Sequence, residues 1–71
     1  MNLTKVLETI NNGEIIKDAI ENFIKVQEHM LSAREENAKK TYSGLKKDYL
    51  SLKVLLNSLG VNLTDIDEIK E

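Results

Sequence analysis

The chain contains no cysteine and no proline. Without cysteine it can form no disulfide bond or thiolate metal site, and it has no thiol nucleophile. A single histidine, His29, would have to serve as the base for any nucleophilic serine. No second histidine or carboxylate lies three or four residues from His29 to complete a helical metal pair. We therefore expect no catalytic, cofactor-binding or metal-binding residue, and no enzymatic activity.

Long apolar runs and glycine-rich loops are missing as well. No stretch approaches the ~20 apolar residues of a membrane-spanning helix, and the first residues lack the basic-then-apolar pattern of a signal peptide. The three glycines are too scattered to build a phosphate-binding loop. We expect a cytoplasmic location and no membrane partner.

The residues that are abundant favour helix. Leu, Ile, Lys, Glu and Asn dominate, and aromatic residues are few. The bias toward Lys, Ile and Asn is typical of an AT-rich genome, such as that of a low-GC bacterium or its phages. A chain of 71 residues makes one small domain, residues 1–71, and buries only about 60% of its unfolded surface. Well-packed helices or a partner subunit must therefore supply its stability.

Glycine and capping residues divide the chain into helices. Apolar residues at helical spacing in residues 3–10 predict a short N-terminal helix, which ends at Asn11-Asn12-Gly13. A long helical pattern then runs over residues 14–59, and Gly60 supplies its C-terminal glycine. Thr64 predicts the N-cap of a short final helix, whose first turn holds acidic residues where the helix dipole favours them. This capping explains the acidic residues without a bound cation.

One apolar seam keeps its phase between residues 14 and 59. At 100° per residue its members fall within roughly 40° of one direction. The seam, which we expect to form the core and a dimer interface, consists of Ile16, Ile20, Phe23, Met30, Leu45, Leu52, Leu56 and Leu59. Its phase does not slip across Gly44, and a glycine inside a helix costs only ~1 kcal/mol relative to alanine. Residues 39–50 are therefore predicted to be helix rather than turn.

A polar stretch at residues 34–37 divides this seam into two blocks, residues 15–33 and 38–59, each about 30 Å long as helix. Blocks of equal length about a polar centre fit an antiparallel pair. The chain either bends near Arg34–Asn37 into a helical hairpin or stays straight and pairs with a second molecule. Asn37 is the one residue there with turn chemistry, whereas its neighbours favour helix, so both arrangements stay open. The fold class is all-α in either case.

The width of the apolar arc in residues 15–33 indicates a partner subunit. The arc spans nearly 180°, whereas an ordinary surface helix buries a stripe of ~100°. A single partner helix cannot cover it. The N-terminal helix would cover a part, and we expect a second subunit, in a homodimer, to cover the rest.

A basic and aromatic surface is the one candidate for binding nucleic acid. Residues 34–53 carry six basic and three acidic side chains, although the net charge of the chain is −2. Lys39, Lys46 and Lys53 recur every seventh residue beside the seam, and Tyr42 and Tyr49 lie on its nearer edge. Such residues can contact phosphates and stack on bases. Lysines also flank dimer seams for solubility, and the overall acidity of the chain favours this second interpretation.

These patterns predict a small, non-enzymatic helical module that binds another protein. A phage or mobile-element regulator or inhibitor would fit its size and composition. The alternative function is a nucleic-acid or nucleotide-binding helical dimer that uses the surface between Lys39 and Lys53.

Overall fold

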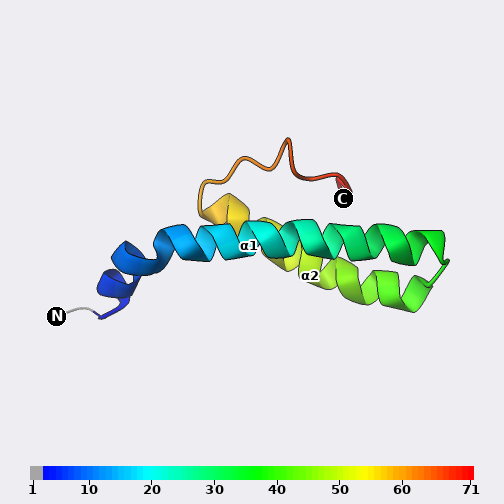
Figure 1. Cartoon of the computed structure of the whole chain (residues 1–71), viewed down its shortest axis with the longest axis horizontal. Coiled ribbons are helices and arrows are strands. Elements are labelled where there is room, and N and C mark those ends of the chain that lie inside the picture. Colours follow the sequence, from blue (N-terminus) through cyan, green and yellow to red (C-terminus); the bar gives the residue numbers. More distant parts are fainter. Residues whose placement is uncertain (1–2) are drawn as a thin grey trace.

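The computed structural model describes the backbone of residues 3–71 and the side chains of residues 13–71. Helices α1 (Leu3–Glu35) and α2 (Lys39–Ser58) form an antiparallel hairpin (Figure 1). Residues 61–71, called the tail below, run back along this hairpin without forming a helix. Because α1 is longer than α2, its N-terminal part projects beyond the hairpin. The molecule is elongated, with extents of 51 × 23 × 15 Å.

A Schellman motif at Asn37 makes the bend between the two helices. Asn37 adopts a left-handed conformation, with φ of 59°, which asparagine tolerates better than most residues. The N–H of Ala38 donates to the carbonyl of Ala33 at 2.8 Å, and that of Asn37 donates to Arg34 at 3.1 Å. The structure thus adopts the hairpin, one of the two arrangements that the sequence left open, and bends where the sequence offered turn chemistry.

A second Schellman motif ends α2 at the predicted glycine. Gly60 has a φ of 82°, its N–H donates to the carbonyl of Asn57, and the N–H of Val61 donates to Leu56 at 3.0 Å. Val61 also packs against the buried cluster that contains Leu56, as the apolar residue after such a cap commonly does. Gly44, in contrast, lies inside α2, so the prediction that residues 39–50 are helical is confirmed.

The predicted break after the first helix is wrong. The backbone of α1 continues through Asn11, Asn12 and Gly13, so residues 3–10 do not form a separate short helix. Asparagine and glycine only weaken a helix, by about 1 kcal/mol or less each, and a helix that is already formed gains one hydrogen bond for each residue added. The expected apolar contacts of residues 3–10 concern side chains that lie outside the described ones.

The predicted final helix is also wrong. Residues 64–66 form a single turn, and Asn62 rather than Thr64 caps it: Asn62 Oδ1 accepts hydrogen bonds from the N–H and the hydroxyl of Thr64 at 3.0 and 2.7 Å. Beyond this turn the amides of Glu68 and Ile69 bond to a side chain of α1 instead of to preceding carbonyls. Tertiary hydrogen bonds therefore replace the helix that the local capping pattern at Thr64 favoured.

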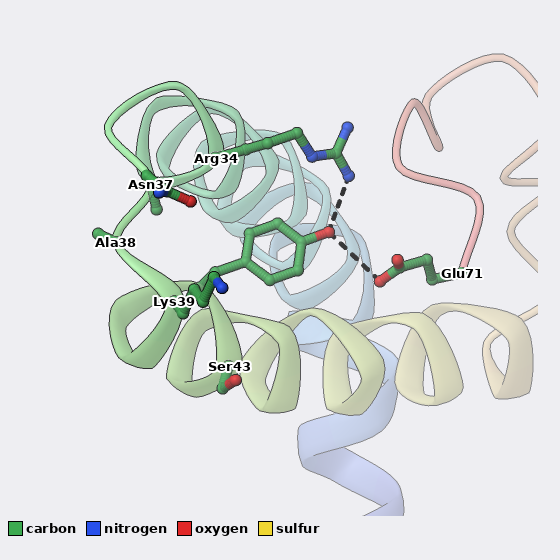
Figure 2. Close-up of a pocket in the computed structure, with 8 residues that line it drawn as sticks. Arg34, Asn37, Ala38, Lys39, Ser43 and Glu71 are labelled. Atoms are coloured by element: carbon green, nitrogen blue, oxygen red, sulfur yellow. Dashed lines mark hydrogen bonds between the residues drawn. The ribbon is translucent and has the colours of Figure 1, made fainter.

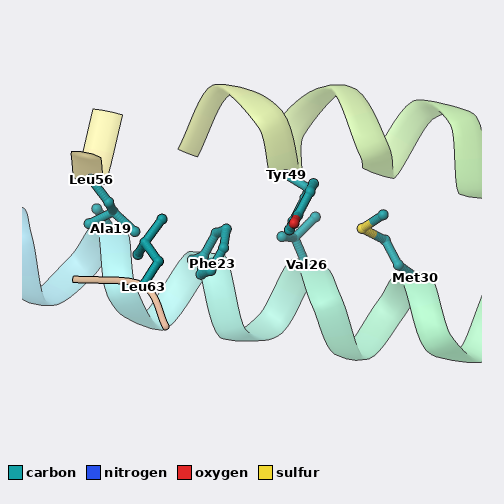
Figure 3. Close-up of a cluster of buried hydrophobic side chains, with 7 residues drawn as sticks. All are labelled: Ala19, Phe23, Val26, Met30, Tyr49, Leu56 and Leu63. Atoms are coloured by element: carbon teal, nitrogen blue, oxygen red, sulfur yellow. The ribbon is translucent and has the colours of Figure 1, made fainter. Parts of the chain in front are cut away.

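The core lies between the two helices and the tail. Its buried members are Ala19, Phe23, Val26, Met30, Tyr49, Leu56 and Leu63 (Figure 3). The rings of Phe23 and Tyr49 stack at the centre, with centroids 5.3 Å apart and planes 15° from parallel. Three layers thus share one core.

The tail covers part of the apolar arc that was expected to need a second subunit. Leu63 is buried, and Val61, Ile66 and Ile69 pack against the same cluster. The N-terminal segment, which was expected to form a separate helix over this arc, instead continues α1 as helix. Among the described residues, no helix is both long and apolar enough to cross a membrane.

Candidate functional site

Gln27 of α1 holds the backbone of the tail. Its side chain is 3% exposed, and its Nε2 donates to the carbonyls of Phe23 at 3.3 Å and Ile66 at 2.8 Å. Its Oε1 accepts from the amides of Glu68 at 2.6 Å and Ile69 at 3.0 Å. All the hydrogen-bonding capacity at both ends of the amide is directed at backbone groups. Gln27 thereby fixes the backbone of residues 66–69 against α1.

Asp67 of the tail forms a second, charged anchor on α2. Its Oδ1 accepts from the hydroxyl of Tyr49 at 2.7 Å and from the amide of Lys70 at 2.9 Å. Its Oδ2 lies 2.8 Å from Lys53 Nζ. The Tyr49 hydroxyl in turn accepts from the amide of Glu71 at 3.1 Å. The buried carboxylate is thus paired and fully hydrogen-bonded, as a charge in a dry environment must be.

The pKa values of this cluster shift in the directions that the contacts require. Burial by itself raises the pKa of the Asp67 carboxyl, but hydrogen bonds from Lys53, Tyr49 and the Lys70 amide outweigh burial and hold that pKa below its usual value. Burial, and then the hydrogen bond to Asp67, raise the pKa of Tyr49. The hydrogen bond to Asp67 raises the pKa of Lys53. At neutral pH the cluster therefore holds a carboxylate, a neutral phenol and an ammonium group.

The end of the tail meets the hairpin close to the bend. Glu71 Oε2 lies 3.3 Å from Lys46 Nζ, and the Tyr42 hydroxyl donates to the same oxygen at 3.4 Å. Arg34 Nη2 donates to that hydroxyl at 2.9 Å, so Arg34 and Glu71 point at one hydroxyl group from two sides (Figure 2). Arg34 also lies over the Tyr42 ring, 5.4 Å from its centroid. These contacts border an open pocket of about 400 Å³ that Lys39 and Ser43 also line.

The tail occupies most of the predicted basic and aromatic surface. Lys46 and Lys53 pair with tail carboxylates, and Tyr49 is 0% exposed, so its ring offers no face for a base to stack on. Tyr42 is half-buried and hydrogen-bonded, while Lys39 is exposed. The acidic tail of the same chain bonds to four of these five residues and leaves Lys39 exposed.

The opposite side of the hairpin carries a groove that the tail does not touch. The groove has a volume of about 450 Å³ and is lined by Asn22, Lys25, Val26 and His29 of α1 and by Leu45, Asp48 and Leu52 of α2. The four α1 residues lie about 100° to 200° from Gln27, measured in one direction around the helix axis, and Gln27 faces the tail. We call the surface that contains this groove the open face.

Two exposed apolar residues extend the open face toward the end of the hairpin farthest from the bend. Ile15, 46% exposed, precedes Val26 by three helical turns and lies about 20° from it around α1. Leu55, 39% exposed, follows Asp48 by two turns and lies about 20° from it around α2. Ser51, also exposed, lies between Asp48 and Leu55.

The predicted seam residues lie between the helices, with graded burial. Phe23, Met30 and Leu56 are fully buried. Ile20, Leu45 and Leu52 are half-buried and pack against the core cluster. Ile16 and Leu59 are half-buried. The seam is thus the contact between the two helices of one chain, and Leu45 and Leu52 also reach the groove of the open face.

The placement of the His, Asp and Glu side chains in residues 13–71 decides whether they could hold a metal ion there. Over residues 13–71 no three side chains among His, Asp and Glu come together in a way that could hold a metal ion. His29 lines the open groove, and no side-chain hydrogen bond or ion pair joins it to a neighbour within residues 13–71. The chain matches no protein-family model, and searches of curated proteins and of solved structures found no match either. The geometry alone must therefore indicate the function.

Sequence reasoning missed Gln27 and Asp67, the two residues that anchor the tail. Gln27 is the one long polar side chain in an otherwise apolar part of the α1 pattern, at the azimuth of the seam itself. A polar residue at such a position usually marks a specific buried hydrogen bond, and this signal was available. The role of Asp67 had no local signal, because its partners Tyr49 and Lys53 are 18 and 14 residues away in sequence.

Proposed function

We propose that this protein is a non-enzymatic interaction module that binds another protein helix through its open face. The observation that carries the proposal is the asymmetry of the hairpin. Apolar residues of the tail cover one side, whereas the other presents a groove lined in part by Val26, Leu45 and Leu52, with exposed Ile15 and Leu55 beyond it on the same face. A helix that lays an apolar stripe along such a groove is a common mode of protein recognition.

The amount of exposed apolar surface also supports this proposal. Isolated exposed apolar residues are ordinary, but Ile15 and Leu55 lie in line with Val26 and Asp48, which line the groove. A helix seated between α1 and α2 would remove these side chains from water, each contributing about 25 cal/mol per Å² of apolar area buried.

The alternative function, binding of nucleic acid, receives less support. Two of the three lysines of that surface are paired with tail carboxylates, and one of its tyrosines is buried. A nucleic acid would have to displace the tail, and with it the hydrogen bonds of Gln27 and Asp67. We therefore favour a protein partner.

Site-specific photo-crosslinking in the source cell tests this proposal. A photo-reactive amino acid replaces Ser51 on the open face, and a matched variant carries it at Val54, which is 69% exposed. Around α2, Ser51 lies about 60° from the groove residue Asp48, whereas Val54 lies about 120° from it. We expect a nuclease-resistant protein adduct from position 51 and a much weaker one from position 54. An adduct that nuclease removes, or equal adducts from both positions, would contradict the proposal.

A further inference from the structure

We propose that the open face binds a second copy of this chain, in a two-fold dimer whose axis runs parallel to the hairpin. This inference rests on the proposed function and names the partner of the same surface. In the dimer, α1 of each copy packs against α2 of the other. All neighbouring helices of the resulting four-helix bundle are then antiparallel, as in up-and-down bundles.

The charges of the groove fit this arrangement. Lys25 of α1 and Asp48 of α2 line the same groove, and neither belongs to an ion pair within residues 13–71. A two-fold axis along the hairpin brings Lys25 of one copy opposite Asp48 of the other, and it does so twice. The surface is therefore complementary to itself, as the isologous interface of a two-fold dimer requires.

The apolar residues of the open face fit the same symmetry. Ile15 lies near the start of the paired part of α1 and Leu55 near the end of α2, so both lie at the same end of the hairpin. Ala19 and Leu56, their near neighbours in sequence, meet in the core at this end (Figure 3). The dyad brings Ile15 of one copy and Leu55 of the other to the same end of the interface, with Ile15 about 7 Å farther from the bend, again twice. Two residues that are exposed in the single chain are thereby placed at the edge of the interface.

The size of the face suits a reversible dimer. The paired part of the hairpin is as long as α2, about 30 Å, and two packed helices are about 20 Å wide, which gives roughly 600 Å² per copy. Stable interfaces bury about 800 Å² per partner, so this face lies at the small end of the range. We therefore place the dissociation constant in the micromolar range rather than lower.

Charge reversal in the full-length chain tests this dimer by sedimentation equilibrium. The wild-type chain should approach twice its mass of 8.1 kDa as its concentration rises through the micromolar range. Lys25→Asp and Asp48→Lys each place like charges opposite one another twice and should weaken dimerisation about tenfold or more. The double variant Lys25→Asp/Asp48→Lys restores opposite charges across the dyad and should dimerise nearly as well as the wild type.

Matched controls make the same charge changes elsewhere on the exposed surface. Lys17→Asp on α1 and Asp65→Lys in the tail should leave the dimer unchanged. A wild-type chain that stays monomeric, or a dimer that tolerates both single reversals, overturns the two-fold arrangement. If the position 51 adduct then proves to be a different protein, the proposed function stands without this partner.

Discussion

Asp67 is the residue on which the charged contacts of the tail converge. Three donors reach its carboxylate within 3 Å, from a phenol, an ammonium group and a backbone amide. Removing one member of such a buried set leaves the others without partners, which costs more than the pair itself contributes. At this scale the structure depends on a few polar side chains that an apolar pattern does not reveal.

The dependence of stability on pH follows from the directions in which folding shifts the pKa values of Asp67, Tyr49 and Lys53. The folded chain lowers the pKa of Asp67 from its ordinary 3.8, so the resulting stability is present above that value and is lost as the pH falls through the folded pKa. The pKa values of Tyr49 and Lys53 are raised from 10.0 and 10.5. Their contributions are present below those values and are lost as the pH rises through the folded ones.

Asp67→Asn should lower the free energy of unfolding at pH 7 by about 1–3 kcal/mol, because the amide pairs poorly with Lys53 and Tyr49. It should also flatten the acid side of the curve of stability against pH. Asp65→Asn, an exposed neighbour in the tail, is the matched control and should change stability by less than about 0.5 kcal/mol. Chemical denaturation between pH 3 and 7 measures the free energy of unfolding of both variants. Equal losses in the two variants would show that Asp67 does not anchor the tail.

At the scale of the helices and the tail, two glycines show that the backbone conformation decides whether replacement by alanine stabilises or destabilises the protein. Gly44 lies inside α2, and a methyl group added there would meet no atom within 4 Å beyond its chain neighbours and the backbone of its own helix. Gly60 also has open space around it, but its φ of 82° lies in the left-handed region. The same substitution should therefore have opposite effects at the two positions.

Gly44→Ala should raise the free energy of unfolding by roughly 0.5–1 kcal/mol, since alanine favours helix and restricts the unfolded chain. Gly60→Ala should lower it by about 1 kcal/mol, because alanine is strained at positive φ. Thermal unfolding of the two variants beside the wild type measures both changes. A destabilised Gly44→Ala protein would mean that this part of the chain is not helical.

The sequence predicted the elements whose signals are local. The helical phase of the seam continued through Gly44 without a change, and Gly60 and Asn37 marked the positions where the chain turns. It failed at two weak local signals, one outweighed by propagation of the helix and the other by tertiary hydrogen bonds. Asn11–Gly13 resemble a helix end but only weaken the helix, and Thr64 resembles an N-cap, although Gln27 binds the amides that a final helix would have used.

At the scale of the whole molecule, the hairpin has one face closed by its own tail and one face open. The width of the apolar arc correctly indicated that one helix could not cover α1, but the sequence could not tell that residues 61–71 would supply part of the cover. The tail reaches α1 through contacts about 40 residues apart in sequence, at Gln27 with Ile66 and Glu68, and no local pattern encodes them. The open face is the part of the hairpin that the tail leaves uncovered.

Concentration-dependent chemical shifts of the backbone amides of the full-length chain test the open face most directly. As the concentration rises through the micromolar range, we expect the amides of Asn22, Ser51 and Leu55 on the open face to shift together and to saturate. Those of Ile69 and Lys70, held on the opposite face, should stay in place. Shifts that are absent over this range, or that are largest along the tail, would contradict self-association through the open face.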